Sequence, residues 1–176
     1  MPHEAAPTPR RPLLAAGVAL GIGLGGFLDG IVFHQILQLH HMFSARFAPT
    51  TVAQLEFNML WDGIFHLFTW GMTAAGVVML FDAGRRPEVP WCGRTLLGAT
   101  AVGWGAFNLV EGTVAHHLLR VHHVVERLGP SGWDWAFLAS GVLLIGVGIA
   151  LMRSSPASTV REPEEAVAPG PVPSAS

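Results

Sequence analysis

Charged residues and cysteine are scarce in this 176-residue chain. Only 12% of its residues are charged, 51% are apolar, and the mean hydropathy is +0.45. This composition is too apolar for an ordinary soluble domain of this length. The formal net charge is -2 and no basic run occurs, so no nucleic-acid partner is expected. The single cysteine, Cys92, excludes an intramolecular disulfide and a cysteine-based zinc motif. The sequence therefore predicts a membrane protein whose chemistry depends on other side chains.

Four apolar stretches are long enough to cross a hydrocarbon core of about 30 Å, which takes roughly 20 helical residues. We expect an all-α membrane domain over residues 12–152, between a disordered arm (1–11) and a disordered tail (153–176) that have little to bury. The four transmembrane helices are expected at about residues 13–39, 63–81, 95–119 and 135–152.

The arginines that flank these stretches are unevenly distributed, and an excess of positive charge marks the cytoplasmic side. Six adjoin the span ends near the two termini and three adjoin the opposite ends; the two groups are Arg10, Arg11, Arg85, Arg86, Arg94 and Arg153, and then Arg46, Arg120 and Arg127. We therefore expect both termini in the cytoplasm and the histidine-rich ends of the first and third helices on the outer side.

One segment of the chain occurs twice. Residues 29–41 read DGIVFHQILQLHH and residues 111–123 read EGTVAHHLLRVHH. A gapless alignment pairs an acid, a histidine and a double histidine: Asp29 with Glu111, His34 with His116, and His40-His41 with His122-His123. Trp61-Asp62 and Trp133-Asp134 form a weaker second match. We predict an internal duplication that gives two parallel helical hairpins, related by a pseudo-twofold axis along the membrane normal.

The acids and histidines share one side of each repeated helix, because a helix turns about 100° per residue. Large aliphatic residues occupy the other side of the first helix, so the polar side chains are expected to face the interior of a bundle. Asp29 and Glu111 lie about ten residues, or roughly 15 Å, below the outer surface. An unpaired carboxylate there costs at least about 2.5 kcal/mol. These acids need partners, which are either the imidazoles or a metal ion.

Imidazoles and carboxylates that converge from several helices form di-iron and di-manganese sites, and they also suit zinc and copper(II). No methionine or cysteine stripe suggests copper(I). The predicted ligands are His34, Asp62, His66, Glu111 and His116. Further ligands, or residues that orient the ligating imidazoles, are predicted at Asp29, Asn108, His117 and Asp134. Four histidines at or beyond the interface either capture metal from outside, sense pH or have no function: His40, His41, His122 and His123.

The spacing within each repeat constrains this prediction. Asp29 and His34 are five residues apart, as are Glu111 and His116, which places the members of each pair about 140° apart on a regular helix. A π turn would bring them together. Without one, one member of each pair ligates and the other supports it. The spacing also differs from the Glu-x-x-His motif of soluble di-iron bundles, and the HxxHH motif of membrane desaturases is absent.

Two other functions use the same residues. A haem b could be held by two axial histidines such as His34 and His116, or the group could form a pH-responsive proton pathway. Nothing in the sequence identifies a substrate pocket, so enzymatic activity stays undecided. Pairing of two chains through their glycine-rich helix faces also stays open.

Three strings carry a resemblance to a known family: FLDGIVFHQILQLHHM, LWDGIFHLFTW and NLVEGTVAHHLLRVHHV. They resemble the signature segments of a bacterial family of four-helix membrane proteins of unknown function, over residues 12–152. The resemblance implies the bacterial cytoplasmic membrane and a four-helix topology. The family is loosely associated with genes for assembly of haem-copper cytochrome oxidase, which implies metal handling, oxidase assembly or redox chemistry, with assembly proteins as partners.

Overall fold

The computed structural model describes residues 10–155, and these residues form helices and connecting loops without any strand. In chain order the elements are α1 (Arg11–Leu28), the π-helix η1 (Asp29–Ile36), α2 (Val52–Gly84), α3 (Gly93–Glu111), the π-helix η2 (Gly112–Leu118), the 3₁₀-helix η3 (Glu126–Leu128) and α4 (Gly132–Arg153). The predicted arm and tail, residues 1–11 and 153–176, fall almost entirely outside the described residues.

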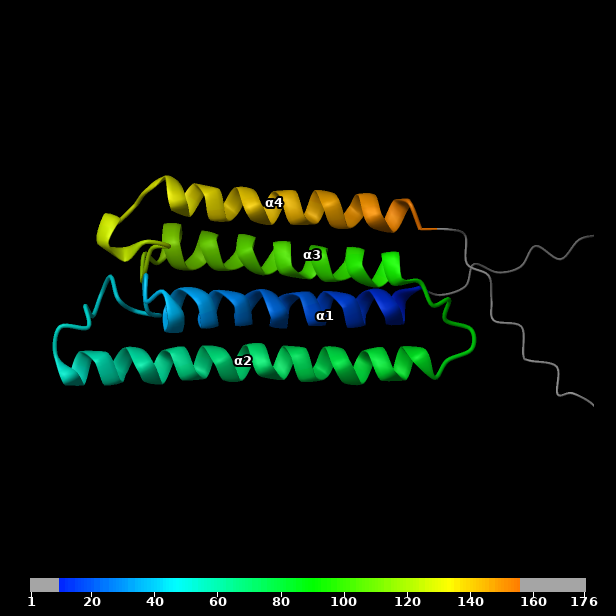
Figure 1. The fold of residues 1–176 in the computed structure, drawn as a ribbon, viewed down its shortest axis with the longest axis horizontal. Helices are drawn as coiled ribbons and strands as arrows, with labels where there is room; N and C mark the ends of the chain where they lie inside the picture. The colour runs from blue at the N-terminus through cyan, green and yellow to red at the C-terminus, as the bar shows by residue number, and fades with distance from the viewer. Residues whose placement is uncertain (1–9, 156–176) are drawn as a thin grey trace, which may run out of the picture.

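The four α-helices lie side by side in one layer (Figure 1). α1 contacts α2 on one side and α3 on the other, and α3 also contacts α4. The backbone of α2 does not closely approach that of α3 or α4, and the backbone of α1 does not closely approach that of α4, so the order across the layer is α2, α1, α3, α4. The structure therefore differs from the bundle expected from the sequence. Both π-helices lie at the same end of the layer, which we call the histidine end.

Three helices are long and apolar enough to cross a membrane, where the sequence led us to expect four. They are Arg11–Ile36, Val52–Gly84 and Gly132–Arg153. The expected span at residues 95–119 falls on α3 and η2, which carry many small or polar side chains. α3 is flanked by α1 and α4, and the opposing backbones cover much of its surface. It therefore needs a less apolar sequence than the outer helices α2 and α4.

The helix α2 extends beyond the apolar stretch that predicted it. It begins at Val52 rather than near residue 63, because the hydroxyl of Thr51 caps it by accepting a hydrogen bond from Gln54 N at 3.3 Å. Phe43 and Phe47 of the preceding loop pack on this extension against Phe57, with ring centroids 5.8 and 4.8 Å away. The extension thus positions the loop that carries the first double histidine.

The inner helices α1 and α3 approach each other through glycine. A Cβ atom at Gly21 would collide with the carbonyl oxygen of Thr100, and one at Gly103 would collide with that of Val18. The gapless alignment pairs Gly21 with Gly103 and Val18 with Thr100. The contact that α1 makes on α3 through Gly21 is therefore equivalent to the contact that α3 makes on α1 through Gly103. This close approach brings the ends of α1 and α3 together at the histidine end.

A methyl group at this contact should destabilise the protein. We expect Gly21→Ala to lower the free energy of unfolding by about 1–3 kcal/mol, the usual cost of overpacking, and therefore to lower Tm in detergent. Gly71→Ala is the matched control, because a Cβ at Gly71 in α2 meets nothing within 4 Å. Circular dichroism on heating would measure both variants, and an equal loss in both would contradict the proposed importance of this contact.

Candidate metal centre

The π-helices solve the spacing problem that the sequence poses. A π turn places residues five apart on one face, so η1 brings Asp29 and His34 together, with 3.4 Å between Oδ2 and Nε2. In η2 the same arrangement leaves 3.3 Å between Oε2 of Glu111 and Nε2 of His116. The structure therefore contains the π turn that the spacing requires if both members of each pair are to share one site.

A reversal of the chain follows each π-helix. Gln38 and Arg120, which the alignment pairs, both adopt left-handed backbone conformations with φ of 49° and 50°. The turn sends the chain back into the layer, where His40 is 2% exposed and His122 is 1% exposed. These two histidines are therefore buried inside the protein, where they can contact the acids of η1 and η2. Neither left-handed position is a glycine, so the sequence gives no indication that the chain reverses there.

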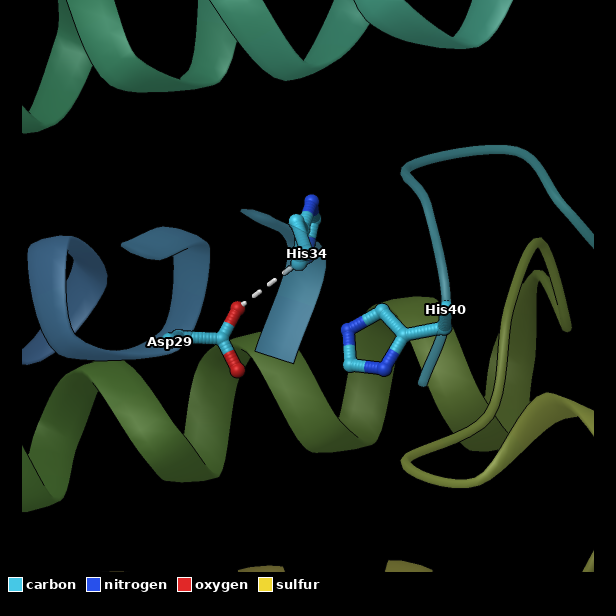
Figure 2. Close-up of side chains that lie close together, drawn as sticks. All are labelled: Asp29, His34 and His40. Atoms are coloured by element: carbon cyan, nitrogen blue, oxygen red, sulfur yellow. Dashed lines mark ion pairs between the residues drawn. The ribbon is translucent and has the colours of Figure 1, made fainter. Parts of the chain in front are cut away.

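Three side chains from η1 and the following loop converge. Figure 2 shows Asp29, His34 and His40 turned towards one another, and each offers a ligand atom within 4.8 Å of the others. We call this group triad one. His40 Nδ1 donates to the carbonyl oxygen of Val124 at 3.0 Å, which leaves the lone pair of its Nε2 free. The Nε2 atoms of His34 and His40 are buried without a hydrogen-bond partner.

The second repeat forms an equivalent group, triad two, from Glu111, His116 and His122. His122 Nδ1 donates to the carbonyl oxygen of Met42 at 3.0 Å, which mirrors the bond from His40 to Val124. The longer side chain of Glu111 also reaches the Nε2 of His122, at 2.8 Å. Triad two is therefore held together by a hydrogen bond that triad one lacks.

The two triads touch through their imidazole rings. The rings of His40 and His122 stack with centroids 4.5 Å apart and an interplanar angle of 2°. His34 lies 4.5 Å from His40, and His116 lies 4.9 Å from His122, both edge-on. The four rings form one cluster between α1 and α3, with a carboxylate at each side.

An aspartate from an outer helix supports each triad. Asp62 of α2 accepts hydrogen bonds from Nδ1 of His34 at 2.9 Å, Nδ1 of His41 at 2.7 Å and the backbone N–H of Met42 at 2.8 Å. Because Nδ1 of His34 donates to Asp62, its Nε2 is the nitrogen that faces Asp29. Asp62 thus fixes both the orientation and the tautomer of a triad histidine.

Asp134 of α4 occupies the corresponding place beside triad two, but more loosely. It accepts hydrogen bonds from the backbone N–H groups of Val124 and Ser131, both at 2.9 Å. Its oxygens lie 3.3 Å from Nδ1 of His116 and 3.4 Å from Nδ1 of His123, and both of these nitrogens lack a hydrogen bond. The two halves share a plan but differ in how tightly each aspartate holds its histidines.

The remaining predicted site residues lie outside the triads. His66 donates from Nδ1 to the backbone carbonyl of Asp62 at 2.8 Å. His117 packs against the ring of Trp135 with centroids 4.6 Å apart. Asn108 donates to the hydroxyl of Ser140 at 2.9 Å. The predicted ligands that reach a triad are thus His34, Glu111 and His116, whereas Asp62 and His66 stand beside triad one. Asp29, predicted as a ligand or a supporting residue, is a member.

The charge of this region favours cations. Three buried carboxylates, from Asp29, Asp62 and Asp134, gather at the histidine end with the half-buried carboxylate of Glu111. Within the described residues every ion pair that they form is with a histidine, and no arginine takes part. A protonated His122 offsets one of these charges, but a neutral imidazole such as His40 offsets none, and buried charge without compensation is costly. A bound cation would relieve it.

The loop histidines of the two triads differ in their protonation. Burial lowers the pKa of His40 well below its ordinary value of 6.5, and the nearby imidazoles of His122 and His34 lower it further. Burial also acts to lower the pKa of His122, but the hydrogen bond to Glu111 and the charge of that carboxylate outweigh it and raise the pKa. His40 is therefore neutral at pH 7 and ready to ligate, while a ligand role for His122 requires the loss of a proton.

A pocket adjoins each triad at the histidine end. A pocket of about 510 Å³ is lined by His40, His41 and Glu126 among others. A second pocket of about 470 Å³ is lined by His116, His123 and Asp134 among others. Each triad therefore has a pocket of its own beside it.

The family described as Predicted membrane protein (DUF2243) matches residues 16–155. The chain belongs to this family. The matched range contains both triads and both supporting aspartates, and the family description agrees with the apolar helices. The function of the family is unknown. A search of curated proteins found no match, and neither did a search of solved structures.

The pKa difference between the two loop histidines can be measured in metal-free protein. We expect His40 to stay neutral, with its proton on Nδ1, throughout about pH 6 to 8. We expect His122 to keep its positive charge as the pH rises past 6.5. Nitrogen-15 NMR of histidine-labelled protein in detergent would show both, with resonances assigned by His40→Ala and His122→Ala. Titration of both rings at the ordinary pKa would contradict the hydrogen-bond assignments.

Proposed function

We propose that this protein binds two transition-metal ions in the membrane, one in each triad. The observation that carries the proposal is the pairing of two equivalent sets of one carboxylate and two imidazoles, whose ligand atoms lie within 4.8 Å of one another. In triad one, two of the three residues present buried nitrogens without hydrogen-bond partners. Ligands about 2.1 Å from a tetrahedral ion lie roughly 3.4 Å from each other, so small side-chain movements suffice to hold an ion.

The ligand set narrows the choice of metal. Two imidazoles and one carboxylate suit iron(II), zinc, manganese or copper(II), and the same set holds catalytic iron and zinc elsewhere in proteins. Three protein ligands leave coordination positions open, whereas structural zinc sites are closed by four. This favours metal handling or redox chemistry over a structural role, and assembly of a respiratory oxidase is one setting in which either would be used.

The residues around the ligands strengthen the proposal. Metal-bound histidines usually donate their other ring N–H to a carboxylate or a backbone carbonyl. His34 donates to Asp62, and His40 and His122 donate to carbonyls. All three therefore direct Nε2 into their triads; the Nε2 of His40 presents a free lone pair, whereas the Nε2 of His122 must first lose the proton that it donates to Glu111.

The proposal includes an internal duplication of the chain and an orientation of the protein in the membrane. Reciprocal hydrogen bonds of His40 and His122, together with reciprocal glycine contacts of α1 and α3, support two hairpins related by a pseudo-twofold axis. The arginine excess at the far end supports cytoplasmic termini. The triads would then receive metal from the outer side of a bacterial cytoplasmic membrane, through the pockets at the histidine end.

The structure gives less support to the two other functions. A haem between the repeats would have to separate the imidazoles of His40 and His122, whose stacked rings fill the space between the triads. A proton pathway would have to continue towards the far end. No ionisable residue occurs in α1 between Arg11 and Asp29 or in α3 between Arg94 and Glu111, a gap of roughly 25 Å.

Metal stoichiometry tests the proposal directly. We expect two ions per chain in purified protein loaded with iron(II) or zinc and washed, as measured by inductively coupled plasma mass spectrometry. Asp29→Ala with His40→Ala should leave one ion, and so should Glu111→Ala with His122→Ala, because each double variant removes two of the three ligands of one triad. The four substitutions together should leave none.

His66→Ala is the control, because His66 was a predicted ligand but lies in neither triad. It should retain two ions. Circular dichroism and size-exclusion chromatography would establish that each variant keeps its helices. Two ions bound by the fourfold variant, or a metal-free wild-type protein under loading conditions, would refute the proposal.

The supporting aspartates should influence metal affinity unequally. Removal of a carboxylate that orients a ligating imidazole typically weakens metal binding by about 10–100-fold. We expect Asp62→Asn to have this effect at triad one, since Asp62 binds both His34 and His41. Asp134→Asn should weaken triad two less, because the histidine contacts of Asp134 are longer. Competition with a chromophoric chelator would measure both, and equal losses would contradict the asymmetry.

A further inference from the structure

One broad face of the layer contains an apolar pocket that reaches triad one. The pocket measures about 340 Å³ and lies between α1 with η1, α3 and α4. Its walls include the rings of Phe33, Trp104 and Phe137, and its polar lining comes from Asp29, Asn108 and Ser140. Because α1 and α4 span the membrane, the pocket opens towards lipid rather than towards the pockets at the histidine end.

An aromatic ring occupies the position that corresponds to this pocket in the other half of the protein. The gapless alignment pairs Gly25, which lines the pocket, with Phe107. The ring of Phe107 is buried, lies 6.0 Å from that of Phe65, and contacts the Cβ position of Gly26. Gly26 and Phe65 are the counterparts of the lining residues Asn108 and Phe137, so Phe107 fills the equivalent space. Gly25 has no side chain, so the first space stays open.

The polar groups of the pocket include two hydrogen-bond acceptors, the carboxylate of Asp29 and Oδ1 of Asn108, beside the second N–H of the Asn108 amide. Asn108 uses its Nδ2 to donate to Ser140, and Ser140 donates to the carbonyl of Phe137 at 2.6 Å. Among the described residues nothing donates to Oδ1 of Asn108. The carboxylate of Asp29 has only the contact of 3.4 Å with His34. A bound molecule must therefore bring a hydroxyl or another donor to satisfy these oxygens.

We propose that this pocket binds the ring of a membrane-soluble hydroquinone, with its apolar tail in the lipid. Three aromatic side chains offer flat apolar surfaces to a ring, and the volume falls within the range of small-molecule sites. A hydroxyl of the ring donates to Asp29 or Asn108. A fatty acid would place a second carboxylate beside Asp29, and an alkyl chain would leave both acceptors unsatisfied. A quinone could accept a hydrogen bond from Asn108 but has no donor for the carboxylate of Asp29.

This inference extends the proposed function at one point, because Asp29 belongs both to the pocket and to triad one. It names the class of molecule that would lie next to a metal ion in that triad. Binding in the pocket does not itself require the metal. The two proposals can therefore fail separately.

A binding assay on the full-length protein in lipid nanodiscs, without oxygen, tests the inference. The probe is a radiolabelled hydroquinone with a decyl chain, and the comparison compounds are the corresponding quinone and decylbenzene. We expect one hydroquinone per chain, bound at least tenfold more tightly than either comparison compound. Leu144→Trp, which enlarges a half-buried lining residue, should weaken binding at least tenfold. Val142→Trp, in the same helix but not in the pocket lining, should change it less than twofold.

Equal binding of all three compounds would mean that any apolar molecule fills the pocket, and this would overturn the inference. Absence of hydroquinone binding would also overturn it, as would an equal loss in the two tryptophan variants. The assay is run on metal-free and metal-loaded protein. Two bound ions without hydroquinone binding refute this inference alone, and hydroquinone binding by a protein that takes up no metal refutes the proposed function alone.

Discussion

The contact between the inner helices α1 and α3 is the constraint on which the cluster of acids and histidines depends. Helices that pack through ordinary side chains keep their axes about 8–10 Å apart, whereas at Gly21 and Gly103 there is no room even for a Cβ atom. Only this proximity lets the loops that follow the π-helices exchange hydrogen bonds and lets the rings of His40 and His122 stack. The glycines therefore decide whether two separate groups of ligands become one centre.

The outer helices act on the same centre from the sides. α2 brings Asp62 to triad one and α4 brings Asp134 to triad two, and each outer helix packs along one inner helix, α2 along α1 and α4 along α3. Buried acids are costly in a membrane unless they are paired. Here every acid of the centre contacts at least one histidine within 3.4 Å. The buried acids are thus divided between the two triads, and one outer helix supports each triad.

The sequence predicted a membrane protein and its helices, because long apolar runs can be read directly from the residues. It also predicted that acids and histidines converge, because they recur on one side of two similar segments. It did not predict the membership of the triads. His40 and His122 depend on left-handed turns at Gln38 and Arg120, which no glycine marks. Asp62 and His66, four residues apart on α2, suggested a shared ion, but Asp62 is engaged by His34 and His41 instead. The sequence also did not predict the flat layer. Helix periodicity shows which side of a helix is buried, but it does not show which helices pack against that side.

A layer one helix thick has consequences that a bundle does not. In a bundle the central residues are shielded from lipid on all sides, and small molecules reach them only from the ends. In this layer α1 and α3 each turn two opposite flanks towards the hydrocarbon, so the centre has lateral neighbours in the plane of the membrane. Gly25 leaves one flank open beside Asp29, while Phe107 seals the other. The two broad faces of the layer therefore differ, just as its two ends differ. The orientation of the protein relative to neighbouring membrane proteins would determine which of them faces the open flank.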